Sequence, residues 1–221
     1  MTASSQLEWI RPPRQARSRA TLDRLLDATE VLLAEKPWEV VGVADIAQRA
    51  DSSVGAFYSR FSDKDAVLNA LYERFVDEAV ATYDEMFDPE RWTGASVSAI
   101  VQAIIAFRVR IYSERVGLLR AFFHLAVYDK GFWVRGKRLR AHFTEAFVQL
   151  IIARRRELLH PEPASAAEFV ARVIQSVLYH RVLFELEQSP DEAWSTDRIT
   201  TELTHTCLAY LGVFPETAMD M

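Results

Sequence analysis

The sequence predicts an all-α protein, because helix-forming residues dominate it and few residues interrupt a helix. Alanine, leucine, arginine and glutamate are abundant, whereas the 221 residues include only seven glycines and eight prolines. Apolar residues recur three and four positions apart over long stretches, as one face of a helix requires. Residues 88–94 break this pattern, so we expect a shorter N-terminal part and a longer C-terminal part.

Composition excludes several classes of protein. Half of the residues are hydrophobic, but the longest apolar runs fall short of the roughly 18 residues that cross a membrane. The first residues are polar and then rich in arginine and proline, which is unlike a signal peptide. The single cysteine, Cys207, excludes an internal disulfide and fits a reducing compartment. We therefore expect a cytoplasmic protein with no membrane partner.

The first helix is expected to begin near Arg17 and to end before Pro37. Pro12 and Pro13 keep the preceding residues extended. Leucines and one threonine at helical spacing form its apolar stripe, on which the next helices can pack. The stripe consists of Leu22, Leu25, Leu26, Thr29, Leu32 and Leu33.

Two short helices and a tight turn follow between Val43 and Phe61. The apolar face of the first helix is formed by Val43, Ile46, Ala47 and Ala50. Residues 51–53 are turn and cap residues, and the Ser53 hydroxyl can accept free amide hydrogens of a second helix that begins at Val54. Two helices joined in this way predict a helix-turn-helix.

The second of these helices has a surface suited to nucleic acid. Gly55 and Ala56 in its first turn are small enough to let the backbone approach base edges in the major groove. Tyr58 offers a hydroxyl at phosphate distance, while Phe57 and Phe61 turn inward and anchor the helix. Asp63 can cap the next helix, and Lys64 adds a cation that suits a phosphate.

At these residues the chain resembles the TetR family of transcriptional repressors, whose motif reads roughly D-I-A-x-x-A-G-V-S-x-G-x-x-Y-x-x-F-x-x-K-x-x-L. The matching residues are Asp45, Ile46, Ala47, Ala50, Ser53, Gly55, Tyr58, Phe61, Lys64 and Leu68. Asp51 replaces the usual turn glycine, and aspartate tolerates the same geometry nearly as well. Ser52 replaces the usual valine. Gly42 stands where a threonine is common, so we assign it no DNA contact.

The resemblance implies a homodimeric repressor that binds a palindromic operator and that a small molecule releases. It implies neither enzymatic activity nor a cofactor. The first turn of the second helix holds no Asn, Gln or Arg for bidentate base contacts, so sequence preference is expected to depend on DNA shape. The residues expected to contact DNA are Arg14, Arg17, Ser52, Ser53, Val54, Gly55, Ala56, Tyr58, Ser59, Arg60 and Lys64.

The net charge of −5 argues by itself against a nucleic-acid partner. Whether a protein binds nucleic acid depends on the charge near the contact, however, because attraction between a cation and a phosphate is screened beyond roughly 10 Å. Residues 9–22 contain four arginines and no acidic residue. We therefore expect residues 1–16 to be a flexible basic arm that follows the DNA backbone or enters a minor groove. A solvated tail without function is the alternative.

The expected domain borders follow from these elements. Residues 17–77 form the DNA-binding domain, and residues 78–215 form a helical ligand-binding and dimerisation domain, followed by a tail at 216–221. A helix that begins after Asp63 and runs to about Met86, which is about 30 Å long at 1.5 Å per residue, links the two. Further helices are expected at about 95–113, 115–128, 132–157, 164–187 and 193–213.

Apolar residues occupy more than one face of segment 164–187, which indicates burial on more than one side. We expect one side to meet the domain core and the other to meet a second subunit in a four-helix interface. A central helix in a monomeric bundle is the alternative. The residues expected in the dimer interface are Val170, Ile174, Leu178, Leu203, Tyr210 and Leu211.

Aromatic residues are dense between Phe107 and Phe147, and most of them must form core. A cavity among them would suit an apolar or aromatic molecule, with an arginine or a histidine to orient it. A filled core, and for His180 a hydrogen-bonded core histidine, are the alternatives. The residues expected to line the cavity are Phe107, Arg108, Ile111, Phe122, His124, Trp133, Phe143, Phe147, Val177, His180 and Phe184.

Two Glu-x-x-His pairs, Glu157/His160 and Glu202/His205, have the spacing that di-iron carboxylate bundles use. His160 stands before Pro161, where a helix must end, and His205 falls away from the apolar face, so surface positions explain them better. The sequence has no Gly-rich phosphate loop and no H-E-x-x-H, and we expect no metal site. The rivals to the repressor are a helical metalloenzyme and a non-specific DNA- or protein-binding module.

Overall fold

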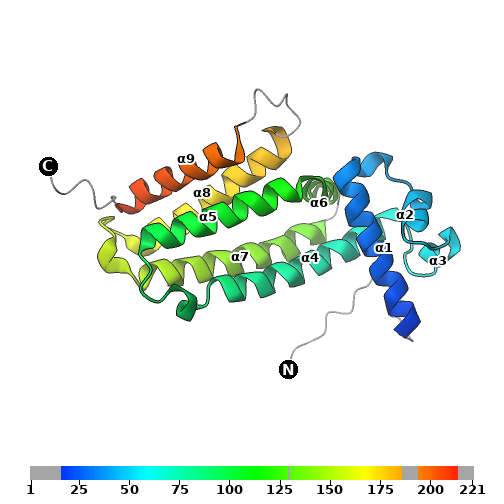
Figure 1. The fold of residues 1–221 in the computed structure, drawn as a ribbon, viewed down its shortest axis with the longest axis horizontal. Coiled ribbons are helices and arrows are strands. Elements are labelled where there is room, and N and C mark those ends of the chain that lie inside the picture. Colours follow the sequence, from blue (N-terminus) through cyan, green and yellow to red (C-terminus); the bar gives the residue numbers. More distant parts are fainter. Residues whose placement is uncertain (1–15, 129, 186–193, 214–221) are drawn as a thin grey trace. The chain divides into compact units, whose positions relative to one another are not determined.

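The computed structural model describes residues 16–128, 130–185 and 194–213, and its architecture is all-α, as predicted (Figure 1). Short helical turns lie between the main helices: η1 (Trp38–Val40), η2 (Pro89–Trp92), η3 (Arg155–Glu157) and η4 (Arg181–Glu185). The main helices are α1 (Ala16–Glu35), α2 (Val43–Arg49), α3 (Val54–Tyr58), α4 (Lys64–Met86), α5 (Val97–Glu114), α6 (Val116–Tyr128), α7 (Lys130–Ile152), α8 (Pro163–His180) and α9 (Thr196–Leu211).

The chain forms two compact units. The first contains α1, α2, α3, α4 up to Glu78, and the segment Gly117–Trp133 with α6. The second contains the rest of α4, α5, α7 from Val134, α8 and α9. The border inside α4 lies beside the expected residue 77. Segment 117–133, which lies within the range expected for the C-terminal domain, has its contacts with the N-terminal helices.

The first unit is built on the stripe of leucines along α1. α1 packs against α2, and α2 packs against α3. Phe57 and Phe61 are buried, as predicted, and their ring centroids lie 5.0 Å apart. Tyr72 of α4 meets Phe122 of α6 with 5.0 Å between ring centroids, so aromatic contacts join α6 to this core.

The second unit is a bundle in which α5 packs against α8 and α9, which also pack against each other (Figure 1). Buried aliphatic side chains from all three helices fill the space between them. They include Ile100, Ile104 and Val109 of α5, Val170, Ile174 and Leu178 of α8, and Ile199, Leu203 and Leu211 of α9.

The helix predicted at 132–157 ends earlier, at Ile152. Arg154 lies outside it and donates hydrogen bonds from Nε to the carbonyl of Ala95 at 2.8 Å and from Nη2 to that of Trp92 at 2.5 Å. The Glu157 carboxylate accepts the amide hydrogen of Val97 at 2.7 Å and so caps α5. These side chains bind the backbone before α5, and Glu157 thereby has a structural role instead of pairing with His160.

Within the part of the chain that the structure describes, each helix is too short or too polar to cross a lipid bilayer.

Candidate DNA-binding surface and ligand pocket

The turn between α2 and α3 has the geometry that its sequence predicts. Asp51 has φ of 47°, in the left-handed region where the related motif has glycine. The Ser52 amide donates to the carbonyl of Ala47 at 2.9 Å and closes the turn. Ser53 Oγ accepts the amide hydrogen of Ala56 at 3.1 Å, which confirms the predicted cap of α3.

The first turn of α3 faces solvent. Val54, Gly55 and Tyr58 are exposed, whereas Phe57 beside them is buried. A side chain at Gly55 would meet only Ser53 Oγ, at 3.8 Å, so packing inside the protein does not require a glycine here. The absence of a side chain at Gly55 therefore leaves the backbone of α3 open to close approach by another molecule. Tyr58 follows this open turn in α3, and its side chain is 50 % exposed.

Other predicted DNA contacts lie around α3. Ser53 and Ser59 are exposed, and the Ser59 hydroxyl donates to the carbonyl of Ala56 at 2.7 Å. Ser52, Ala56 and Arg60 are half-buried. Arg14 and the side chain of Arg17 lie outside the described residues.

Lys64 is tied to its own domain. Its ammonium donates a hydrogen bond to the carbonyl of Trp38 at 2.5 Å and lies 4.2 Å from the centre of the Trp38 ring. Burial lowers the pKa of Lys64. Asp63 caps α4 as predicted, because Asp63 Oδ1 accepts the amide hydrogen of Ala66 at 2.8 Å. The start of α4 is thus fixed at the end of the helix-turn-helix.

Ion pairs hold the helices that support α3. The Asp45 carboxylate accepts the Gly42 amide hydrogen at 2.9 Å at the start of α2. Lys36 Nζ contacts the same carboxylate at 2.6 Å, and this hydrogen bond, followed by the one from Gly42, lowers the pKa of Asp45. Arg74 of α4 contacts Asp27 of α1 at 2.5 Å and Glu30 at 3.0 Å. The helices that support α3 are therefore joined to one another by ion pairs.

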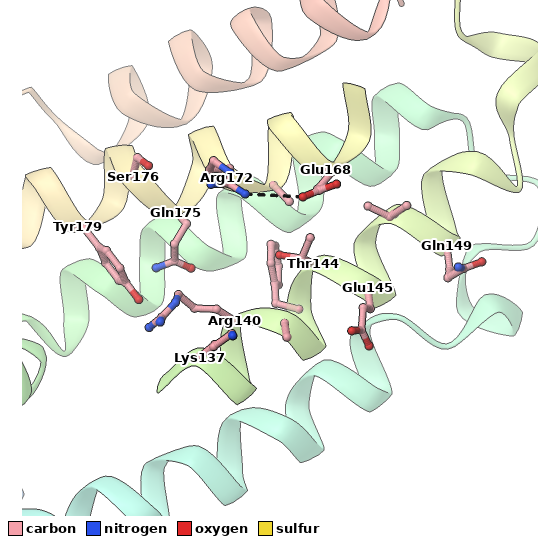
Figure 2. A pocket seen from close by; sticks show the side chains of 14 residues that line it. Lys137, Arg140, Thr144, Glu145, Gln149, Glu168, Arg172, Gln175, Ser176 and Tyr179 are labelled. Atoms are coloured by element: carbon pink, nitrogen blue, oxygen red, sulfur yellow. Dashed lines mark ion pairs between the residues drawn. The ribbon is translucent and has the colours of Figure 1, made fainter. Parts of the chain in front are cut away.

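The second unit contains a pocket of about 680 Å³ between α7 and α8. In Figure 2, Lys137 and Arg140 of α7 lie opposite Gln175 and Tyr179 of α8, and Glu145 lies further along α7. The lining residues are Lys137, Arg140, Ala141, Phe143, Thr144, Glu145, Val148, Gln149, Glu168, Ala171, Arg172, Gln175, Ser176 and Tyr179.

Arg108 of α5 lies behind the wall of this pocket. Only 2 % of its surface is exposed. Its Nη2 donates hydrogen bonds to Tyr112 Oη at 3.1 Å and to Gln175 Oε1, and its guanidinium carbon lies 4.0 Å from the centre of the Phe143 ring. Gln175 and Phe143 line the pocket. The pocket wall is therefore in direct contact with a buried cation.

Arg108 keeps its charge in this site. Burial acts against the charge, but the nearby oxygens of Tyr83, Tyr112 and Tyr179 outweigh burial and raise the pKa of Arg108 above its usual value. Burial, followed by the neighbouring Tyr112, raises the pKa of Tyr179, so this phenol is neutral and its hydroxyl keeps a proton that it can donate.

The structure brings together only part of the predicted ligand set. Among the members of that set whose side chains the structure describes, only Phe143 lines the pocket, and Arg108 contacts two lining residues. Phe122 packs on Tyr72 in the first unit, and His124 Nδ1 lies 3.0 Å from Glu39 there. Phe147 is buried core. The remaining predicted residues are not among the lining residues: Phe107, Ile111 and Val177 are half-buried, His180 and Phe184 are exposed, and the side chain of Trp133 lies outside the described residues.

Sequence reasoning missed Gln175 and Tyr179, because single polar residues on a long helix resemble a solvated face. The signal that could have found the site was Arg108 and Tyr112, which lie four residues apart on the apolar side of their helix. A cation at a core position needs polar partners from a neighbouring helix.

Five of the six residues expected in the dimer interface face the core of their own chain. Val170, Ile174, Leu178, Leu203 and Leu211 are buried within one chain, because α5 and the α8–α9 contact cover them. Of the predicted set, only Tyr210 is exposed, and its ring centroid lies 5.0 Å from that of Phe169, which is also exposed.

Comparisons with known proteins agree with this architecture. Residues 25–71 match the family model for bacterial regulatory proteins of the tetR family. Among solved structures, the chain is similar to a TetR-family transcriptional regulator from Mesorhizobium loti, with a TM-score of 0.67, 14 % identity and coverage of 90 % of this chain and 100 % of that one.

Two further solved structures extend the likeness. NalD of Pseudomonas aeruginosa, the secondary repressor of the MexAB-OprM multidrug efflux pump, matches with a TM-score of 0.61, 16 % identity and coverage of 88 % of this chain and 98 % of its own. A TetR transcription regulator from Haloarcula marismortui matches with a TM-score of 0.64, 14 % identity and coverage of 87 % and 97 %. At such identities these structures establish a common fold. A comparison with curated protein sequences gives no match.

Proposed function

The chain belongs to the TetR family of transcription regulators, and from this premise we propose that it is a repressor that binds a palindromic operator as a homodimer and that a small molecule releases. The family assigns it to regulators rather than to enzymes. The observation that carries the proposal is the open first turn of α3, which has small side chains and an outward-facing Tyr58. Such a turn suits close approach to base edges.

The proposed DNA contacts divide into two groups. Val54, Gly55 and Ala56 approach the major groove, and Val54 can touch a thymine methyl group. The other group supplies hydrogen bonds and charge to phosphates and to the flanking backbone or minor groove. It comprises Arg14, Arg17, Ser52, Ser53, Tyr58, Ser59 and Arg60.

Dimerisation is proposed through the exposed side of α8 and α9. Phe169 of α8 and Tyr210 of α9 are exposed by 47 % and 42 %, and their rings contact each other at a tilt, with 5.0 Å between the centroids. Phe184 in η4 is also exposed. Two large apolar side chains that contact each other on the surface favour burial by a partner. Two identical chains would place two reading helices on one duplex, about 34–36 Å apart or a multiple of that distance.

The pocket between α7 and α8 supports the proposed response to a small molecule. Its volume of about 680 Å³ lies in the range of about 300–1,000 Å³ that is typical of small-molecule sites. Phe143, Val148 and Ala171 offer apolar contacts in it, beside polar groups that can orient a ligand. A ligand that binds one arrangement of the dimer more tightly shifts the population away from the operator-binding arrangement.

The function is tested by selecting purified protein on a random duplex pool at physiological salt. We expect a palindrome to be enriched by the natural sequence and by Val134→Ala, which changes an exposed residue of α7. Tyr58→Ala is expected to lose this enrichment while it unfolds at the same temperature. Recovery of no palindrome would indicate a non-specific binding module, and equal selection by Tyr58→Ala would show that α3 is not the reading helix.

A further inference from the structure

We propose that the small molecule recognised by the α7–α8 pocket is an organic carboxylate with an apolar body, and that Arg108 pairs with its carboxylate group. This inference rests on the proposed function of the pocket as the effector site. It adds the chemical class of the effector and the end of the pocket at which its charged group binds.

The first argument is the unpaired charge of Arg108. Within the described residues its Nε and Nη1 have no hydrogen-bond partner, and no carboxylate forms an ion pair with it. A buried charge without a counterion is costly, and protein interiors normally pair such groups. An anion in this position would supply both the missing charge and the missing acceptors.

The second argument is the position of Gln175. Its Oε1 accepts a hydrogen bond from Arg108, and its Nε2 donates to Tyr112 Oη at 2.8 Å, so the neutral amide occupies the place where an acidic partner would bind. Gln175 also lines the pocket, on a half-buried stretch of α8. A ligand carboxylate that displaces this amide would exchange a neutral acceptor for a charged one, which binds a guanidinium about twice as strongly.

The third argument is the distribution of charge around the pocket. Near Gln175 and Tyr179, Figure 2 shows Arg140 and Lys137, both cationic. Of the acidic lining residues, Glu168 pairs with Arg172 at 3.6 Å, and Glu145 lies further along α7. The end of the pocket that contacts Arg108 is therefore cationic. Phe143 and Ala171 line the pocket as well and provide apolar contacts for the body of the ligand.

The proposal is tested with matched pairs of probes: naphthoate, phenylbutyrate and decanoate, each compared with its primary carboxamide. Binding is followed by thermal unfolding and by titration calorimetry. We expect at least one carboxylate to raise the unfolding temperature and to bind at least tenfold more tightly than its amide, as a charge-assisted pair predicts. Amides that bind as tightly as the acids, or no binding by any carboxylate up to about 10 mM, would overturn the proposal.

Variants separate a ligand contact from a structural role. Arg108→Met keeps the volume and removes the unpaired charge, so we expect an unchanged or higher unfolding temperature without ligand, together with the loss of carboxylate binding. Arg108→Lys is expected to retain part of the binding. Arg110→Met is the matched control, because Arg110 is an exposed arginine of the same helix that does not line the pocket, and this variant should bind carboxylates as tightly as the natural sequence does. Carboxylate binding by Arg108→Met at the level of the natural sequence would exclude the assignment.

Operator binding distinguishes failure of this inference from failure of the proposed function. Arg108→Met is expected to hold the selected operator and to be insensitive to the carboxylate that releases the natural protein. If the natural protein binds an operator that no carboxylate releases, the proposed repressor function is supported and the proposed carboxylate effector is excluded. If carboxylates bind through Arg108 but no operator is selected, the proposed ligand class is supported and the proposed repressor function is excluded.

Discussion

Lys64 illustrates how one side chain can serve the fold at a position where its family motif suggests a DNA contact. The motif places a lysine after the second helix, and its charge suits phosphate. In this chain the ammonium is bound to the Trp38 carbonyl and lies over the Trp38 ring. Trp38 in turn donates from Nε1 to Asp65 Oδ1 at 3.1 Å. Lys64 and Asp65 thus hold η1 against the first turn of α4.

We predict that Lys64→Ala lowers the stability of the protein more clearly than it changes DNA binding. Loss of one hydrogen bond to a carbonyl should reduce the free energy of unfolding by about 1 kcal/mol. Loss of a phosphate contact would lower the salt slope of binding by about one unit, and we expect a smaller change because the ammonium is engaged inside the domain. Denaturant unfolding and operator titrations at several salt concentrations measure both quantities. A full unit of slope with unchanged stability would contradict this assignment.

At the scale of elements, the start of α6 depends on a glycine. A Cβ atom at Gly117 would lie 1.8 Å from the carbonyl oxygen of Leu33 in α1, a distance that no packed structure accepts. The backbone of α6 therefore approaches the backbone of α1 directly. Aromatic contacts of Phe122 with Tyr72 continue this packing further along α6.

We predict that Gly117→Ala destabilises the protein by about 1–3 kcal/mol, because the backbone of α1 cannot yield as a flexible side chain would. Gly55→Ala is the matched control, since its new methyl group would meet only Ser53 Oγ at 3.8 Å and alanine favours a helix. The control should unfold at the same or a higher temperature, although it crowds the DNA surface. Equal unfolding temperatures for Gly117→Ala and the natural sequence would show that α6 can shift without cost.

Elements fixed by local chemistry could be predicted, and those fixed by distant contacts could not. Asp51 and Ser53 satisfy their own turn and helix end, so their roles follow from neighbouring residues alone. The two apolar stripes of α8 look alike in the sequence, and contact with α5 and α9 decides that the stripe with Val170 faces inward. The pocket was missed for the same reason, because its character depends on Arg108 meeting Gln175 across 67 positions of sequence.

At the scale of the whole molecule, the proposed affinity for an operator depends on dimerisation. α3 is one short helix of five residues, so a single chain has few contacts with DNA. Joining two chains makes the second contact intramolecular and raises the overall affinity by orders of magnitude. In the proposed dimer, the exposed Phe169 and Tyr210 would supply the apolar contact surface, far in sequence from the helix-turn-helix.

We predict that Phe169→Glu converts the protein to a folded monomer with operator affinity lowered on the order of 100-fold. A carboxylate on this side chain would have to lose its water in the interface, whereas in one chain it remains exposed. Sedimentation at micromolar concentration measures the mass, and thermal unfolding checks that the chain is folded. Val134→Glu adds the same charge at a residue that is 71 % exposed on α7, and it should stay dimeric with normal operator affinity. If Phe169→Glu remains dimeric, the interface does not lie on the exposed side of α8 and α9. If the natural protein is monomeric, the dimerisation on which the proposed operator affinity depends does not occur.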